Sequence, residues 1–75
     1  MAETQTFQRP YILGIEGGGT RTTALLADAR GREIQRATFG PGNLRLLDDR
    51  ALRRLLRQVA KQFESPDAIG LGLAG

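Results

Sequence analysis

The fold is decided by residues 11–28, which read YILGIEGGGTRTTALLAD. Two runs rich in aliphatic and β-branched side chains, 11–16 and 22–28, flank a loop that contains three consecutive glycines. Runs of this composition are typical of β-strands, and so short a loop joins neighbouring strands as an antiparallel hairpin. The stretch therefore predicts a β-hairpin whose loop consists of Gly17, Gly18, Gly19, Thr20 and Arg21.

A third strand is expected over residues 33–39, which read EIQRATF. It follows a turn at residues 29–32, in which Gly31 supplies the positive φ that such a turn needs. The alternation of apolar and polar residues along this strand is imperfect. It predicts that Ile34 shares a face with Arg36 and Thr38.

The clearest helix follows a Gly-Pro-Gly-Asn break at residues 40–43. Asp48 or Asp49 is expected to cap its first amides, and the residue before Pro66 is disfavoured in the α region, which ends the helix. Residues 68–75, AIGLGLAG, then predict a buried strand that opens onto a glycine loop. The helix is amphipathic because six apolar side chains recur with its period: Leu52, Leu55, Leu56, Val59, Ala60 and Phe63.

The composition limits the chemistry that this chain can perform. Its 75 residues make one small domain, and they include neither cysteine nor histidine. Disulfides, thiolate metal sites and a histidine base are therefore excluded. Carboxylates, hydroxyls, backbone amides and a metal held by oxygen remain, which is the chemistry of magnesium and phosphate.

The sequence argues against nucleic acids and membranes as partners. The net charge is +3, but no motif that reads a nucleic-acid groove accompanies the arginines, so we expect no nucleic-acid binding. The chain has no secretory signal and no run of eighteen apolar residues, so we expect no membrane span and a cytoplasmic location.

The glycine loop is the stretch most suited to binding a ligand. Three glycines leave no side chains in the way of a ligand, and successive amides in such a turn can form an anion-binding nest. Thr20 adds a hydroxyl donor, Arg21 adds a positive charge, and Glu16 can hold magnesium beside phosphates. The sequence favours a phosphate-binding loop here, and a hairpin turn without a ligand is the alternative.

Residues 13–22 resemble the first phosphate motif of the actin/Hsp70/sugar-kinase superfamily. The glutamate at position 16 followed by Gly-Gly-Gly-Thr is similar to the N-acetylglucosamine kinase branch of the BadF/BadG/BcrA/BcrD ATPase family. The order of strands and helix is similar as well. The resemblance implies an α/β fold, namely part of a ribonuclease H-like (actin-like ATPase) lobe, in an enzyme that phosphorylates an amino sugar with ATP and Mg²⁺.

The resemblance also implies roles for individual residues. Gly18, Gly19 and Thr20, together with Gly17, would bind the β- and γ-phosphates of ATP, and Glu16 would organise Mg²⁺ through water. Asn43 matches the position of an asparagine that hydrogen-bonds the amino sugar in this branch; a turn-forming asparagine is the equally supported alternative. Arg21 is expected to be solvated more than to neutralise phosphate.

The expected organisation is a flexible N-terminus at residues 1–10, followed by the first part of an N-terminal ATPase lobe at 11–75. The family's catalytic aspartate and adenosine site would lie beyond this segment, in a larger two-lobe protein, so the segment alone is expected to be inactive. The expected partner is a small-molecule sugar, and a homodimer is left open.

Three other interpretations compete. Residues 70–75 match G-x-G-x-x-G, but the match begins inside a predicted strand instead of after it, which disfavours a dinucleotide site. No glycine is followed by lysine and a hydroxyl residue, which excludes a P-loop. A partner-coupled activator ATPase of the BadF/BadG type, or an inactive folding fragment, remains as the alternative to a sugar kinase.

Overall fold

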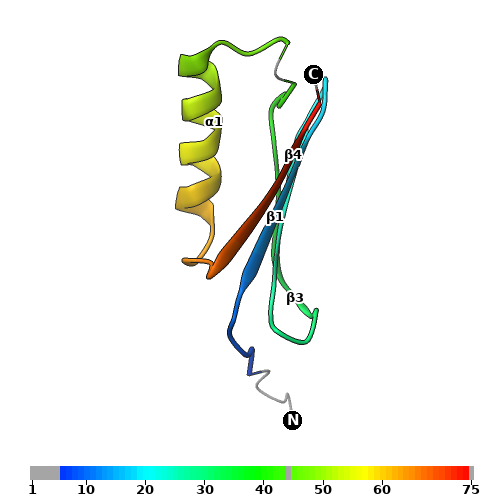
Figure 1. Cartoon of the computed structure of the whole chain (residues 1–75), viewed down its shortest axis with the longest axis vertical. Coiled ribbons are helices and arrows are strands. Elements are labelled where there is room, and N and C mark those ends of the chain that lie inside the picture. The colour runs from blue at the N-terminus through cyan, green and yellow to red at the C-terminus, as the bar shows by residue number, and fades with distance from the viewer. Residues whose placement is uncertain (1–5, 44, 75) are drawn as a thin grey trace.

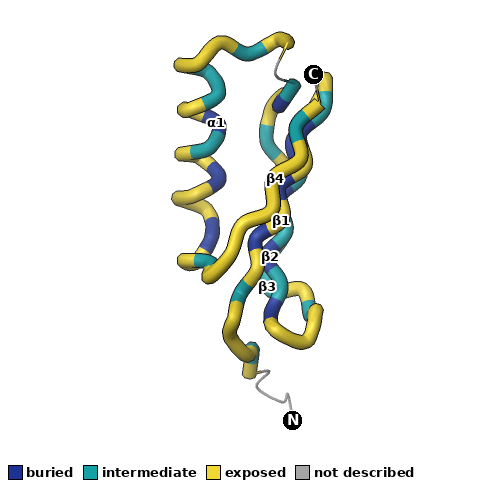
Figure 2. Tube along the Cα trace, viewed as in Figure 1, coloured by how far each residue is buried: buried dark blue, intermediate teal, exposed yellow. Residues whose placement is uncertain are grey.

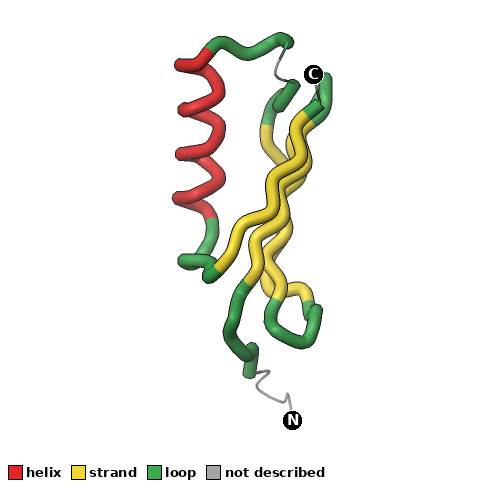
Figure 3. Tube along the Cα trace, viewed as in Figure 1, coloured by secondary structure: helices red, strands yellow, loops and turns green. Residues whose placement is uncertain are grey.

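The structure, a computed structural model, describes residues 6–43 and 45–74. It is a small α/β domain in which one helix lies against a four-stranded mixed sheet (Figures 1 and 3). The predicted hairpin, third strand, helix and fourth strand are all present, with ends shifted by two residues at most. The elements in chain order are β1 (Ile12–Gly17), β2 (Thr22–Ala27), β3 (Glu33–Phe39), α1 (Asp49–Gln62) and β4 (Ala68–Leu73).

The strands lie in the order β3-β2-β1-β4. β1 is antiparallel to β2, as the hairpin predicts, and parallel to β4 on its other side. The registers of the two pairings place Leu13 of β1 beside Leu26 and Ile69, in the middle of the sheet. This order makes β3 and β4 the two edge strands of the sheet and leaves β1 hydrogen-bonded on both sides.

The core lies between α1 and one face of the sheet (Figure 2). Alternate residues of β1 and β2 point toward the helix, which contributes Val59 and, at its end, Phe63. Burying each large side chain stabilises the fold by about 1.5–3 kcal/mol. Asp48 is the N-cap, and its side chain accepts a hydrogen bond from the amide of Ala51 at 2.8 Å. The buried core residues are Leu13, Ile15, Ala24, Leu26, Leu55, Val59 and Phe63.

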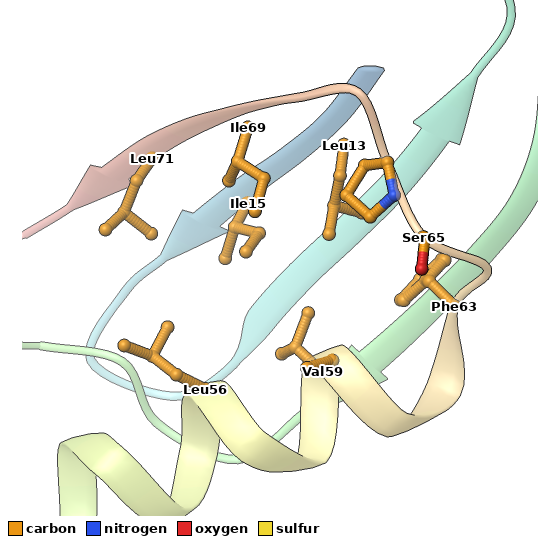
Figure 4. Close-up of a pocket in the computed structure, with 10 residues that line it drawn as sticks. Leu13, Ile15, Leu56, Val59, Phe63, Ser65, Ile69 and Leu71 are labelled. Atoms are coloured by element: carbon orange, nitrogen blue, oxygen red, sulfur yellow. The ribbon is translucent and has the colours of Figure 1, made fainter. Parts of the chain in front are cut away.

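The helix does not cover the β4 edge. Ile69 and Leu71 are 62% and 53% exposed, although they lie on the same face of the sheet as Leu13 and Ile15. An apolar hollow of about 400 Å³ separates them from α1, and Leu56 and Val59 of the helix form its opposite wall (Figure 4). The prediction that the fourth strand is buried is therefore wrong: β4 is an edge strand that the single helix leaves uncovered, and its apolar side chains reach the surface.

The expected facing of Ile34 is wrong because β3 contains an irregularity. Leu26 pairs with Gln35, but Ala27 pairs with Glu33, so Ile34 is an extra residue opposite the Leu26–Ala27 step. A bulge of this kind resets the alternation of side chains. Ile34 consequently packs against the core, whereas Arg36 is exposed.

The turn between β2 and β3 is organised by Asp28, which is buried. Its carboxylate accepts hydrogen bonds from the amides of Gln8, Arg30 and Arg32 and from the Arg32 guanidinium. Gly31 has a φ of 81°, which confirms the predicted left-handed position. The sequence indicated a turn here, but not that a buried carboxylate would hold it.

The start of β1 is tied to the start of β4 by Asp67. Its carboxylate accepts the amide of Tyr11 at 2.7 Å and the guanidinium of Arg9 at 2.9 Å. The Tyr11 amide, and then Arg9, hold the pKa of Asp67 below its usual range. Residues 1–5 of the expected flexible N-terminus, and Gly75 at the end of the predicted fourth-strand run, lie outside the described residues.

Candidate phosphate-binding site

The β1–β2 loop lies at the end of the sheet where three segments meet (Figure 1). The carbonyl of Gly17 accepts the amide of Ala74, which follows β4, at 2.9 Å. The carbonyl of Gly18 accepts the amide of Gly42, which follows β3, at 2.9 Å. The loop, which joins the two inner strands of the sheet, is therefore fixed from both sides.

A polar hollow of about 420 Å³ opens beside this loop. Four of the predicted residues line it, and Arg21 does too, so the structure brings most of the candidate site together. Gly19 is exposed at the tip of the loop and is not part of the lining. The lining residues from the predicted site are Glu16, Gly17, Gly18 and Thr20.

The amides of the loop differ in their partners. The amide of Gly18 donates to the carbonyl of Arg21 at 2.9 Å, which closes the hairpin. Within residues 6–43 and 45–74, the amides of Gly19, Thr20 and Arg21 have no backbone hydrogen-bond partner outside the strands. These successive donors are free to bind an anion.

The three glycines of the loop differ in whether the surrounding protein requires them. Among the described residues, only Gly31 has a positive φ, so the loop does not use the conformations reserved for glycine. A Cβ on Gly17 would lie 2.7 Å from the carbonyl oxygen of Gly42, so Gly17 is needed for packing. A Cβ on Gly18 would come no closer than 3.7 Å to another group, and one on Gly19 would meet nothing within 4 Å. The protein itself leaves room for side chains at Gly18 and Gly19.

Glu16 is the carboxylate of the site. It is exposed on the face of the sheet opposite α1, where it pairs in register with Thr23, another lining residue. The described part of the chain contains no group of three acidic side chains that could enclose a metal. A single carboxylate fits Mg²⁺, which keeps several waters and is usually held by one or two carboxylates together with substrate phosphates.

Asn43 lies outside the hollow. Its Oδ1 accepts the amide of Arg45 at 2.9 Å, and its carbonyl accepts the amides of Leu46 and Leu47. Asn43 therefore forms a turn, and its contact with a sugar stays a prediction. The side-chain amide nitrogen of Asn43 donates no hydrogen bond to a described residue. Asn43 follows directly after Gly42, which contacts the loop.

Sequence reasoning missed Thr23 and Ala74 as lining residues. Thr23 could have been predicted from the hairpin, because pairing the two strands on either side of the loop places Thr23 opposite Glu16. Ala74 could not have been found in this way, because its position depends on β4 pairing with β1 instead of with β3.

Comparisons of the chain with protein-family models, with curated protein sequences and with solved structures found no match in any of the three. No helix among the described residues has the length and apolar character needed to cross a bilayer.

Proposed function

We propose that the β1–β2 loop binds the β- and γ-phosphates of ATP. The observation that carries this proposal is that the amides of Gly19, Thr20 and Arg21 have no hydrogen-bond partner among the described residues outside the strands, next to a polar hollow that Thr20 and Arg21 line. Room for side chains at Gly18 and Gly19 supports it, because a ligand that approaches the backbone closely accounts for glycine where the protein does not.

The side chains of the hollow complement a nucleotide phosphate chain. The Thr20 hydroxyl is a further donor. Arg21 also lines the hollow and adds positive charge there, although it is exposed and we expect its guanidinium to be largely solvated. Glu16 would hold Mg²⁺ through its waters, and the ion would neutralise charge on the phosphates. None of the described aspartates lines this hollow, so we place the proton-accepting group of the reaction outside residues 1–75.

We extend the proposal to the intact protein, as an ATP-dependent kinase of an amino sugar, N-acetylglucosamine, with a ribonuclease H-like lobe that this chain begins. The element order and the antiparallel hairpin support the fold. The side-chain amide nitrogen of Asn43 donates no hydrogen bond to a described residue and lies on a segment that contacts the loop, which supports a sugar site next to the phosphate site.

The kinase proposal is tested by ATP consumption of the intact protein with Mg²⁺ across amino and neutral sugars. Turnover that depends on N-acetylglucosamine or a close relative is the expected result. Hydrolysis without sugar would instead favour a partner-coupled ATPase and would leave the phosphate loop as the part of the proposal that stands.

The loop itself is tested by Gly18→Val, with Gly70→Val as the matched control. A Cβ would find room at both glycines and neither has a positive φ, but Gly70 lies in β4 and does not line the hollow. We expect Gly18→Val to abolish ATP binding with little change in thermal midpoint, and Gly70→Val to bind ATP normally. Undiminished ATP affinity in Gly18→Val would refute the loop assignment.

A further inference from the structure

The segment of residues 40–43 is attached to the phosphate loop and to the start of β2 by hydrogen bonds. The amide of Gly42 donates to the carbonyl of Gly18 at 2.9 Å. The hydroxyl of Thr22, which is fully buried, donates to the carbonyl of Gly40 at 2.8 Å. Two hydrogen bonds, one to the loop and one from the first residue of β2, thus fix this segment beside the loop.

Backbone packing reinforces the attachment. A Cβ on Gly42 would lie 2.9 Å from Cα of Gly17 and would overlap the hydroxyl oxygen of Thr22. The same Cβ would be 3.5 Å from a methyl group of Leu55 in α1, so the segment approaches the loop from the helix side of the sheet. The hollow lies on the other side, with Glu16 and Thr23.

The hydrogen bond from Gly42 determines how the loop presents its first free donor. The carbonyl of Gly18 and the amide of Gly19 belong to one trans peptide unit, and they point in opposite directions because that unit is planar. With the carbonyl directed toward Gly42 on the helix side, the Gly19 N–H is directed away from the helix. Rotation of this peptide unit would break the hydrogen bond to Gly42 and, at the same time, turn the Gly19 N–H away from its present direction.

We propose that Thr22 and Gly42 are positioning residues that hold the Gly18–Gly19 peptide unit for phosphate binding and couple nucleotide occupancy to the placement of Asn43. This inference rests on the proposed phosphate loop. Neither Thr22 nor Gly42 lines the hollow, so each acts through the loop and not by touching the nucleotide. Asn43 follows Gly42 directly, so a loop held in place by phosphates also holds the side-chain amide that is available to the sugar.

The decisive variants are Thr22→Val, which keeps the shape of the side chain but removes the hydroxyl, and Thr22→Ser, which keeps the hydroxyl. We would measure the Kd of a nonhydrolysable ATP analogue with Mg²⁺ in the intact protein. Loss of one neutral hydrogen bond predicts affinity weaker by about 2- to 10-fold in Thr22→Val. Thr22→Ser is expected to bind within about 2-fold of the unmodified protein.

A second readout separates positioning from a general loss of stability. The Kd for N-acetylglucosamine is measured with and without the ATP analogue, and we expect the nucleotide to change it by about 5-fold or more in the unmodified protein. In Thr22→Val this effect should fall below about 2-fold, and Thr22→Ser should restore it. A merely structural role would lower the thermal midpoint without removing the coupling.

The outcomes distinguish the two proposals. Normal nucleotide affinity and unchanged coupling in a folded Thr22→Val protein would overturn the positioning role and leave the phosphate loop standing. Failure of the unmodified protein to bind the ATP analogue would overturn both. Should Thr22→Val not fold, hydrogen exchange of the Gly42 amide in the unmodified protein decides: slower exchange with the analogue supports the coupling, and unchanged exchange overturns it.

Discussion

The carboxylate of Asp28 and the guanidinium of Arg32 form an ion pair at 2.8 Å in which the carboxylate is fully enclosed and the guanidinium is about one-third exposed. Burial alone would raise the pKa of Asp28. The hydrogen bonds from the Arg32 side chain and from the amides of Arg32, Gln8 and Arg30 outweigh it and hold the pKa well below its usual range.

We expect this pair to make the stability of the fold sensitive to acid. Because the pKa of Asp28 is lower in the folded chain than in the unfolded chain, its contribution is complete above the ordinary aspartate pKa of about 4. The contribution declines as the pH falls below about 4 toward the folded pKa. Asp28→Asn should therefore lower the thermal midpoint at neutral pH, and the difference from the unmodified protein should shrink in acid.

Glu33→Gln is the control for this prediction, since the Glu33–Arg36 pair is also short, at 2.9 Å, but about half exposed on both sides. Exposed pairs contribute about 0–1 kcal/mol. A thermal midpoint that responds equally to both substitutions at neutral pH would contradict the role given to Asp28.

The second prediction separates packing from ligand binding within the glycine loop. Gly17→Ala should destabilise the fold by about 1–3 kcal/mol, because its Cβ would lie 2.7 Å from both the Gly42 carbonyl and a methyl group of Leu73. Gly19→Ala meets no other group and should change stability by less than about 1 kcal/mol. Denaturant unfolding of the two variants checks this, and equal losses of stability would show that the close approach at Gly17 is not maintained.

The third prediction concerns magnesium. Glu16→Gln should weaken binding of ATP in the presence of Mg²⁺ by about 10-fold, since the amide lacks the charge that holds the hydrated ion, and should leave binding without Mg²⁺ nearly unchanged. Titration calorimetry with and without Mg²⁺ measures both. Glu64→Gln, an exposed residue that does not line the hollow, is the control. Equal loss with and without the ion would assign Glu16 a role other than metal binding.

The fourth prediction concerns the core. Leu26→Ala should destabilise the fold by about 2–5 kcal/mol, because Leu26 is 0% exposed and its removal leaves a cavity. A domain of this size has a total stability of only about 4–11 kcal/mol, so the variant should be largely unfolded at moderate temperature. Leu46→Ala, at a side chain 66% exposed, should change stability by less than about 0.5 kcal/mol. Circular dichroism melting compares them.

Local patterns predicted the elements of this fold well because each pattern reflects contacts within a few residues. Apolar side chains at helical spacing placed the helix, Asp48 capped it, and Gly31 took the left-handed turn position. The facing of Ile34 could not be predicted, since the irregularity opposite Leu26 is a property of two paired strands.

The same distinction applies to the candidate site. The loop residues are consecutive in sequence, so one motif indicated them, and the structure brings Glu16 and Thr20 to one hollow. Ala74 and Gly42 follow β4 and β3, strands whose ends lie beside the loop although they are distant from it in sequence. A local sequence pattern cannot predict that placement. For Asn43, the family resemblance implied a contact with the sugar, and the residue type indicated a turn.

The approach between Gly17 and Gly42 makes the loop motif discontinuous along the chain. A side chain introduced at either position requires the backbone to move at both, so the two sites constrain each other's evolution and should vary together. A redesigned or transplanted loop must therefore include the Gly-Pro-Gly segment at residues 40–42, because the glycines before Thr20 keep their packing only when Gly42 lies against Gly17.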